Sequence, residues 1–387
     1  MRIINKIMAF SAFLACTTAC VIPNSIYAAE KKESKENKTV FASEMKNSSF
    51  GRFRKDTRVF KVDSNIKVRK VHFQNRYGIS VTGDLYLPKD FNEKQKYAAI
   101  VLSGPFGAVK EQVSGLYAQE MAKNGFVAVA FDPSFTGESS GNVRNVASPD
   151  IFTEDFSAAI DFVGLLPFVD KERLGAIGIC GLSGPAITAA INDVRIKAVA
   201  VSAMYDMTDS IRNHYKGDYY TNEQREIVKK YLAEMRWKEA KKGSTILGYH
   251  EAPVDKNGKV ALPEKGLFPE KLPKDADEVT KGFFDYYRVR AYHPRSINSA
   301  STWSSTTPYG FFNFPLTIHV EELSPRPVML ITGTKAHSKY HSDDVYKRAK
   351  EPKELVVVSG ATHTDLYDQM DKIPFNKLVN YFKKYLK

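Results

Sequence analysis

The sequence predicts an α/β protein whose mostly parallel sheet of about eight strands has helices on both faces. Two segments that alternate apolar and polar residues come first, which is typical of strands with one exposed face. Continuous apolar runs follow, and these are typical of strands buried on both faces of a parallel sheet. Helical stretches separate most of these runs, so the pattern indicates strands joined by helical crossovers.

The predicted elements follow one another along the chain. Residues 68–73 and 79–87 flank the turn residues 75–78 and predict an antiparallel hairpin. Later strands are expected at 98–102, 127–131, 174–179, 198–201, 328–332 and 355–358. Helices are expected at 116–124, 153–166, 185–192 and 373–386. Gly125 suits a helix C-terminus and Pro374 suits a first helical turn, which supports two of these boundaries.

A long interval separates the sixth and seventh predicted strands. It spans roughly 120 residues, which is too long for a connection within a compact domain. It holds a charged amphipathic stretch at 222–242, a loop rich in Lys, Pro and Gly at 255–274, and then an aromatic-rich segment. We therefore expect a core made of residues 58–204 and 320–387, with an inserted cap at 205–319.

The composition indicates a globular protein. The chain has 387 residues, of which 43% are hydrophobic and 26% are charged. Lys and Arg number 56 against 44 Asp and Glu, which gives a net charge of +12 that is spread along the chain. No zinc-finger or RNA-recognition signature accompanies this charge, so we expect no nucleic-acid partner.

The N-terminus predicts a secretory signal peptide. Basic residues precede an apolar run at 7–22, and small residues that suit cleavage follow it. The run is shorter than the ~20 residues that a spanning helix needs. We expect a signal peptide at 1–28 and a flexible polar leader at 29–57, so the protein would be periplasmic or secreted with no transmembrane segment after cleavage. A lipoprotein anchored at Cys16 is the less favoured alternative.

The most informative stretch surrounds Cys180. The chain has 3 cysteines, and signal cleavage would leave Cys180 alone, so no intramolecular disulfide is expected. Cys180 stands between a predicted strand and a predicted helix, with Gly178 two residues before it, which is the pattern of a nucleophile elbow. A helix N-terminus favours a thiolate, and the backbone N–H of Gly181 would point toward a developing oxyanion.

Two further residues belong to this candidate site. Ser183 is an alternative nucleophile, because Leu182 stands where the elbow pattern expects a second small residue. The predicted strand ends at residue 179, which disfavours Ser183, since it would lie about one turn into the following helix. His363 follows the last predicted strand on a short loop, and sites form at the carboxyl ends of parallel strands, so it is the candidate general base.

The order of elbow, insertion and late histidine resembles the α/β-hydrolase superfamily. Within this superfamily, a cysteine nucleophile is similar to that of the dienelactone hydrolase branch. The chain resembles in particular the hydrolases of that branch that are grouped with polyketide transferases and thiohydrolases. The residues that carry the resemblance lie at 104–112, 131–139, 178–181, 204–207, 333–338 and 363–368. The resemblance extends over about residues 65–387, and its motifs do not specify a substrate.

The resemblance implies an α/β-hydrolase fold in which Cys180 is the nucleophile and His363 the base. It also implies that the loop after the third strand supplies a second oxyanion donor beside Gly181. Because proline has no N–H, Phe106 or Gly107 would be that donor rather than the proline of this loop.

The acid of the triad is left open. The resemblance places it at Ala336, which carries no carboxylate. Asp206, after the sixth strand, is the favoured replacement, Asp343 is an alternative, and a site without an acid is a third possibility. A cysteine nucleophile needs the acid less than a serine does, because a Cys–His pair can be ionised at rest.

These features predict an exported hydrolase that cleaves small-molecule acyl esters or thioesters through an acyl-enzyme on Cys180. An acyltransferase on the same site is one alternative. A catalytically retired binding protein is another, motivated by Leu182 and Ala336. We expect no cofactor and no metal, because the chain has no HExxH motif and no phosphate-binding glycine motif. The substrate and the oligomeric state stay open.

Overall fold

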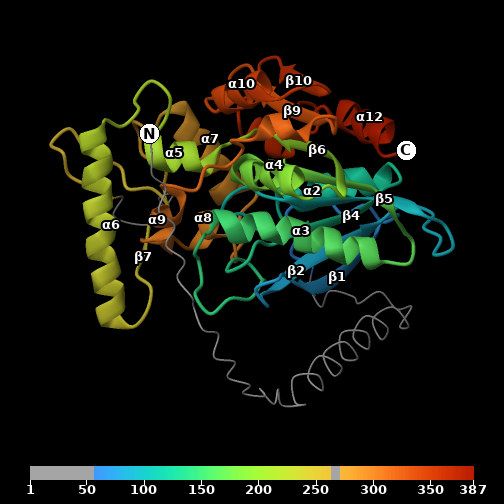
Figure 1. Ribbon diagram of the computed structural model, residues 1–387, viewed down its shortest axis with the longest axis horizontal. Coiled ribbons are helices and arrows are strands. Elements are labelled where there is room, and N and C mark those ends of the chain that lie inside the picture. The colour runs from blue at the N-terminus through green and yellow to red at the C-terminus, as the bar shows by residue number, and fades with distance from the viewer. Residues whose placement is uncertain (1–55, 263–270) are drawn as a thin grey trace, which may run out of the picture. The chain divides into compact units, whose positions relative to one another are not determined.

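An eight-stranded sheet forms the centre of the fold. Its strands are β1 (Lys67–Gln74), β2 (Ser80–Leu87), β3 (Tyr97–Ser103), β4 (Val127–Phe131), β5 (Val169–Ile179), β6 (Ile196–Ser202), β9 (Val328–Gly333) and β10 (Lys353–Val358). The strand order is β1-β2-β4-β3-β5-β6-β9-β10. The β1–β2 and β2–β4 pairs are antiparallel and the other pairs are parallel, which confirms the predicted fold class (Figure 1).

The computed structural model describes residues 56–262 and 271–387. The predicted signal peptide and all but the last two residues of the predicted leader lie outside these ranges. Part of the predicted loop in the inserted interval also lies outside them. The statements below concern the described residues.

The first hairpin is held by the side chain of Asn75. Its Oδ1 accepts hydrogen bonds from the backbone N–H groups of Tyr77 and Ile79, at 3.0 Å each. Its Nδ2 donates to the buried carboxylate of Asp155 at 2.8 Å. Asparagine favours turns because its side chain can take such backbone bonds. The predicted antiparallel hairpin is confirmed.

Helices cover both faces of the sheet. They are α2 (Val113–Lys123), α3 (Pro149–Leu165), α4 (Ser183–Asn192), α10 (Lys339–Arg348) and α12 (Phe375–Tyr385). α2 and α12 share one face, where the rings of Tyr117 and Phe375 are in contact. α3, α4 and α10 lie on the other face. The side-chain alternation along β5 shows this division, since Leu174 approaches α3 whereas the adjacent Gly175 faces α12.

The interval between β6 and β9 folds into one long helix and several short elements. These are α5 (Met207–Asn213), α6 (Asn222–Lys242), β7 (Leu247–Gly248), α7 (Glu278–Phe284), η2 (Asp285–Arg290), α8 (Ile297–Ala300), β8 (Trp303–Ser304), α9 (Thr307–Phe311) and η3 (Val320–Leu323). α6 has the predicted bounds, because Thr221 and Gln224 form a capping box at its start and Gly243 ends it in a left-handed conformation. Figure 1 shows α6, α9 and β7 together on the side of the sheet away from α12. Within the described ranges, no helix is both long and apolar enough to cross a bilayer.

A buried lysine fixes the loop that follows β3. The Nζ of Lys110 lies 2.8 Å from Glu111 Oε1, 3.3 Å from Asp132 Oδ2 and 2.6 Å from Glu138 Oε2. Its backbone N–H also donates to Asp132 Oδ1 at 2.7 Å. Burial lowers the pKa of Lys110, but the surrounding carboxylates raise it by more, so the ammonium stays charged. These contacts tie the loop to the segment that leaves β4.

Lys110→Met would leave the carboxylate of Asp132 buried without its cation, while Glu111 would keep its contact with Arg295. We expect the free energy of unfolding to fall by about 3–5 kcal/mol, as is typical when one partner of a buried ion pair is removed. Lys123→Met removes a partly exposed cation beside Glu120 and is the matched control, with an expected change below about 1 kcal/mol. Urea unfolding at neutral pH measures both values, and equal losses would contradict a stabilising role for the buried cation.

Candidate active site

The turn that follows β5 has the backbone geometry of a nucleophile elbow. β5 runs directly into η1 (Cys180–Leu182) and then α4, and Cys180 has a φ of 54°. Few non-glycine residues adopt this conformation, and those that do cluster at functional sites. A Cβ on Gly178 would lie 2.6 Å from the carbonyl oxygen of Leu182, so a larger residue there would displace the helix start. The glycine two residues before the cysteine is therefore a steric requirement of this turn.

Two backbone N–H groups face the Cys180 sulfur. They belong to Gly181 and Phe106, and each lowers the pKa of the thiol. Of the two donors considered from sequence for the loop after β3, Phe106 is the one at the sulfur. Gly107 instead offers its carbonyl oxygen to the inserted interval, where it accepts bonds from Ser296 Oγ at 2.9 Å and from Asn298 N at 3.3 Å. This loop thereby joins the cysteine to the inserted interval.

The Cys180 thiol is protonated at neutral pH. Burial raises its pKa to about 11, and the opposing hydrogen bonds from Tyr367, Gly181 and Phe106 do not offset that effect. An ionised Cys–His pair at rest, which a cysteine nucleophile can form, is therefore disfavoured by this burial. The position at a helix start is favourable for a thiolate, but desolvation outweighs it here.

His363 is buried between two hydroxyl groups. Its Nδ1 lies 2.6 Å from Ser338 Oγ, and its Nε2 lies 2.9 Å from the hydroxyl of Tyr367. The same Tyr367 hydroxyl is hydrogen-bonded to the Cys180 thiol. Burial lowers the pKa of His363 well below its usual value, and the nearby His337 and His341 lower it further, so the imidazole is neutral. The structure thus brings Cys180 and His363 together through one intervening tyrosine.

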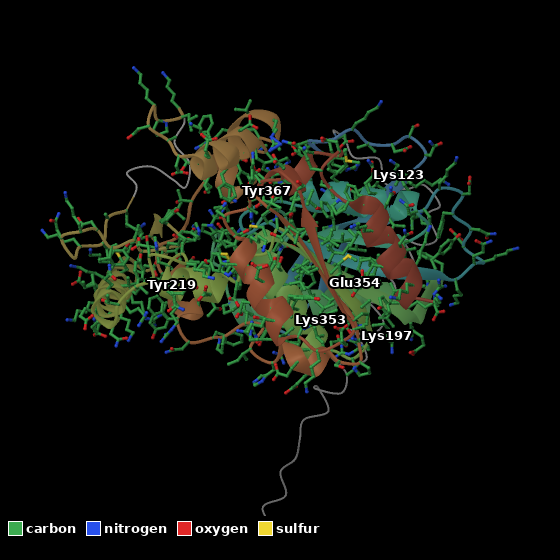
Figure 2. The ribbon with its side chains drawn as sticks, turned by 90° about the horizontal axis from the view of Figure 1, so that it is seen from above. Lys123, Lys197, Tyr219, Lys353, Glu354 and Tyr367 are labelled. Atoms are coloured by element: carbon green, nitrogen blue, oxygen red, sulfur yellow. The ribbon has the colours of Figure 1, made fainter. Side chains whose placement is uncertain are left out.

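Tyr367 was not singled out from the sequence. It lies in α11 (Asp365–Asp368), four positions after His363, so one helical turn places the two side chains on the same side. That spacing was the available signal. Figure 2 labels Tyr367 between Tyr219 of the inserted interval on one side and Lys123 at the end of α2 on the other.

Neither aspartate considered for the triad reaches His363. Asp206 caps α5, where its Oδ1 accepts from Thr208 N at 3.0 Å and from Asp209 N at 3.2 Å, and its Oδ2 accepts from Thr317 Oγ1. Asp343 lies one helical turn from Lys339 on α10, and both of its carboxylate oxygens lie 2.7 Å from that ammonium.

Ser338 occupies the place beside Nδ1 that a triad acid would take. It lies at the start of α10, in the loop where the resemblance locates the acid. Its hydroxyl lies outside the class of carboxylates expected at this position. The contact to His363 therefore corrects the sequence-based choice of Asp206 or Asp343 as its partner.

Ser183, the alternative nucleophile, points away from the site. It begins α4 and is fully buried, and its hydroxyl donates to the carbonyl oxygen of Gly178 at 3.2 Å. Its side chain is thus hydrogen-bonded to the strand that precedes the turn, which agrees with its expected place inside the helix that follows.

Cys180 opens onto a cavity of about 590 Å³. Most of its wall comes from the inserted interval, and aromatic rings predominate. The aromatic and histidine side chains of the wall are Phe106, Tyr205, His214, Tyr215, Tyr249, His250, Phe283, Tyr287, His337, Tyr340 and Tyr367. His337 contacts the Tyr205 hydroxyl through its Nε2. An aromatic wall of this kind suits a small organic molecule.

One group of possible metal ligands occurs within the described residues. His319, Glu321 and Glu322 offer ligand atoms within 4.8 Å of one another, on the exposed side of η3. This group is not part of the cavity wall. Exposed acidic groups of this kind are common without a metal, so we assign it no function.

Comparisons with other proteins place the chain among known relatives, although no protein-family model matches it. It is 48% identical over 330 residues to the uncharacterized protein PA2218 of Pseudomonas aeruginosa, covering 85% of this chain and 84% of that protein. It is 34% identical over 316 residues to the uncharacterized protein YcjY of Escherichia coli, covering 77% and 92%. It is 27% identical over 233 residues to the thiohydrolase aneE of Aspergillus aculeatus, covering 59% and 71%.

Solved structures share the fold. The crystal structure of PA2218 superposes with a TM-score of 0.78 and 46% identity, over 88% of this chain and 100% of that one. The α/β hydrolase GrgF from a Penicillium species gives a TM-score of 0.65 over 82% and 99%, and its 19% identity makes this a likeness of fold alone. The fungal protein of the same name is described as a polyketide transferase. The chain shares the fold of the α/β hydrolase GrgF, and a thiohydrolase and a polyketide transferase are among its more distant relatives. It belongs to the family of PA2218 and YcjY.

Proposed function

We propose that this protein hydrolyses ester or thioester bonds of a small-molecule substrate through an acyl-enzyme on Cys180. One observation carries the proposal: Cys180 sits at a strand-to-helix turn with positive φ, lines the cavity and has two backbone N–H groups at its sulfur. Attack on a carbonyl needs this convergence of a nucleophile with donors for the oxyanion. The names of the thiohydrolase and polyketide transferase relatives support acyl chemistry at this site.

The thiol proton would leave through Tyr367. Its hydroxyl contacts both the thiol and His363 Nε2, so it can accept the thiol proton while it passes its own to the imidazole. Ser338 Oγ accepts a hydrogen bond from Nδ1–H and so holds the ring in the tautomer whose Nε2 can take the proton. This route needs no ionised resting pair, because the proton moves as the sulfur attacks.

The substrate carbonyl oxygen would replace the sulfur at the N–H groups of Gly181 and Phe106 as the tetrahedral intermediate forms. The imidazolium of His363 would return its proton to the leaving group through Tyr367, which breaks the ester or thioester bond and leaves the acyl group on Cys180. Water would release the acid by the same proton route.

Two sequence-based expectations complete the proposal. The interval 205–319 would act as a cap, since it contributes Tyr215, His250 and Tyr287 to the cavity wall. The protein would be exported, because the basic, apolar and small residues of 1–28 follow the order of a signal peptide.

Acyl transfer to an alcohol or amine is a second candidate function. The polyketide transferase grgF, 22% identical over 82% of this chain and 96% of that protein, favours it. The two functions share the acyl-enzyme and differ in the second nucleophile. Added alcohols and amines would accelerate breakdown of the acyl-enzyme beyond its rate in water if transfer is the function.

Incubation with a panel of aryl esters and thioesters is expected to produce both turnover and an acyl adduct on Cys180. Cys180→Ala should abolish the adduct and lower kcat by at least about 10³-fold, because the nucleophile is gone. Ser183→Ala is the matched control and should keep the adduct. Intact-protein mass spectrometry beside product release measures both effects, and an adduct lost only in Ser183→Ala would contradict the assignment.

Tyr367→Phe removes the hydroxyl between Cys180 and His363 and keeps the ring. We expect kcat to fall by about 10²-fold or more with little change in KM, since proton transfer in the transition state is lost. Tyr385→Phe, near the end of α12, is the matched control and should keep the wild-type kcat. Steady-state kinetics on a substrate from the panel tests this, and an unchanged kcat in Tyr367→Phe would mean that His363 takes the proton directly.

Alkylation of Cys180 should follow the raised pKa of its thiol. Burial sets this pKa near 11, so the thiolate fraction in the folded protein keeps rising with pH up to that value. We expect the rate of modification by iodoacetamide to increase about tenfold per pH unit from pH 7 to pH 10, with no plateau near the ordinary thiol pKa of about 8.5. Mass spectrometry gives the rate and circular dichroism checks that the fold persists. A plateau below pH 8 would refute the neutral resting thiol.

A further inference from the structure

The cavity contains a buried carboxylate that the proposed reaction does not use. Glu251 is 6% exposed and lines the same cavity as Cys180. A carboxylate is rarely buried without a partner, because desolvation of the charge is costly. Its position in the wall of a substrate cavity therefore needs a physical explanation.

The partners of Glu251 gather on one of its two oxygens. Oε1 accepts a hydrogen bond from the Tyr215 hydroxyl at 2.8 Å and lies 3.3 Å from His250 Nε2. No donor among the described residues reaches Oε2. Burial raises the pKa of Glu251, but the contacts with His250 and Tyr215 lower it by more, so the carboxylate is ionised at neutral pH. One oxygen of a charged group thus keeps an open acceptor position.

The neighbouring His250 contacts Glu251 through one ring nitrogen only. Its Nδ1 is buried and has no hydrogen-bond partner among the described residues. The polar contact of this ring therefore lies on its Nε2 side, toward Glu251. Lys216 and Asp277, which are exposed, also line this cavity.

Aromatic rings surround the carboxylate. The ring of Tyr249 lies tilted against that of His250 with centroids 4.6 Å apart, and the rings of Tyr205 and Tyr215 are 6.2 Å apart. Aromatic faces attract cations, and more strongly where water is excluded. A buried anion among aromatic rings is thus a site suited to a positively charged group rather than to an alkyl chain.

This site is close to the proposed reaction centre. Phe106 joins the two, because its backbone N–H faces the Cys180 sulfur while its ring lies 5.7 Å from the ring of His250. His250 in turn contacts Glu251. An acyl group attached to the sulfur therefore reaches the carboxylate along the wall that Phe106 and His250 form.

We infer that the cavity selects acyl substrates that carry a protonated amine, and that this ammonium binds Glu251 Oε2 among the rings of Tyr215 and Tyr249. The inference rests on the proposed acyl-enzyme function and specifies its substrate class. Glu251 acts here in substrate selection and takes no part in bond making or breaking.

The test uses ω-aminoacyl thioesters of increasing chain length, each paired with the alkanoyl thioester of equal length. Wild-type protein should prefer the amino member of the best pair by at least about tenfold in kcat/KM, as a charge-assisted bond to a buried carboxylate implies. Glu251→Gln should bring this ratio to about one, because the charge is lost at nearly constant shape. Glu226→Gln, on the exposed surface of α6, is the matched control and should keep the wild-type ratio.

A second measurement separates this inference from the proposed function. Calorimetry on Cys180→Ala should detect binding of an ω-aminoacyl amide but not of its alkanoyl counterpart, and the added Glu251→Gln change should abolish that binding. Turnover of both thioesters with no amine preference would overturn the inference and leave the hydrolase proposal intact. Amine binding without any adduct on the wild-type thiol would support the site and overturn the hydrolase proposal. An undiminished preference in Glu251→Gln would overturn the role of Glu251.

Discussion

The candidate site depends on how closely the backbone segments approach one another at the carboxyl end of β5. A Cβ on Gly104 would lie 2.1 Å from the carbonyl oxygen of Ile179, and one on Gly178 would lie 2.6 Å from that of Leu182. No side chain fits at either place, so the loop after β3, the strand end and the helix start lie directly against one another. This approach brings two N–H groups from different loops to one sulfur. The buried Lys110 network then keeps the loop in that position.

Burial decides the resting chemistry of the site. Desolvation raises the pKa of Cys180 and lowers that of His363, so both groups are neutral and a tyrosine hydroxyl connects them. A buried ion pair would carry the desolvation penalty of two charges at rest, which the neutral pair avoids. The neutral thiol also suits a protein proposed to work in an oxidising compartment, because oxidants react mainly with the thiolate.

The core and the inserted interval contribute different things to the cavity. Cys180, His363, Ser338 and Tyr367 belong to the sheet and the segments that follow its strands, where the backbone is closely packed. The inserted interval adds an aromatic wall and the carboxylate of Glu251. Reaction groups held by a sheet and recognition groups held by an insertion can vary independently, which is how one fold serves many substrates. The physical separation explains why family membership leaves the substrate of this chain open.

The sequence by itself determined the features that neighbouring residues control. The hairpin, the buried strands, the bounds of α6 and the glycine before Cys180 each follow from local spacing, capping or steric need. The tertiary structure alone decided the strand order that places β4 between β2 and β3, since that depends on pairing between distant segments. It also decided that Ser338 rather than Asp206 meets His363, and that Tyr367 stands between the histidine and the thiol. Such contacts depend on the paths of several loops, and the pKa values depend on how deeply those loops bury each group, so no local pattern in the chain encodes them.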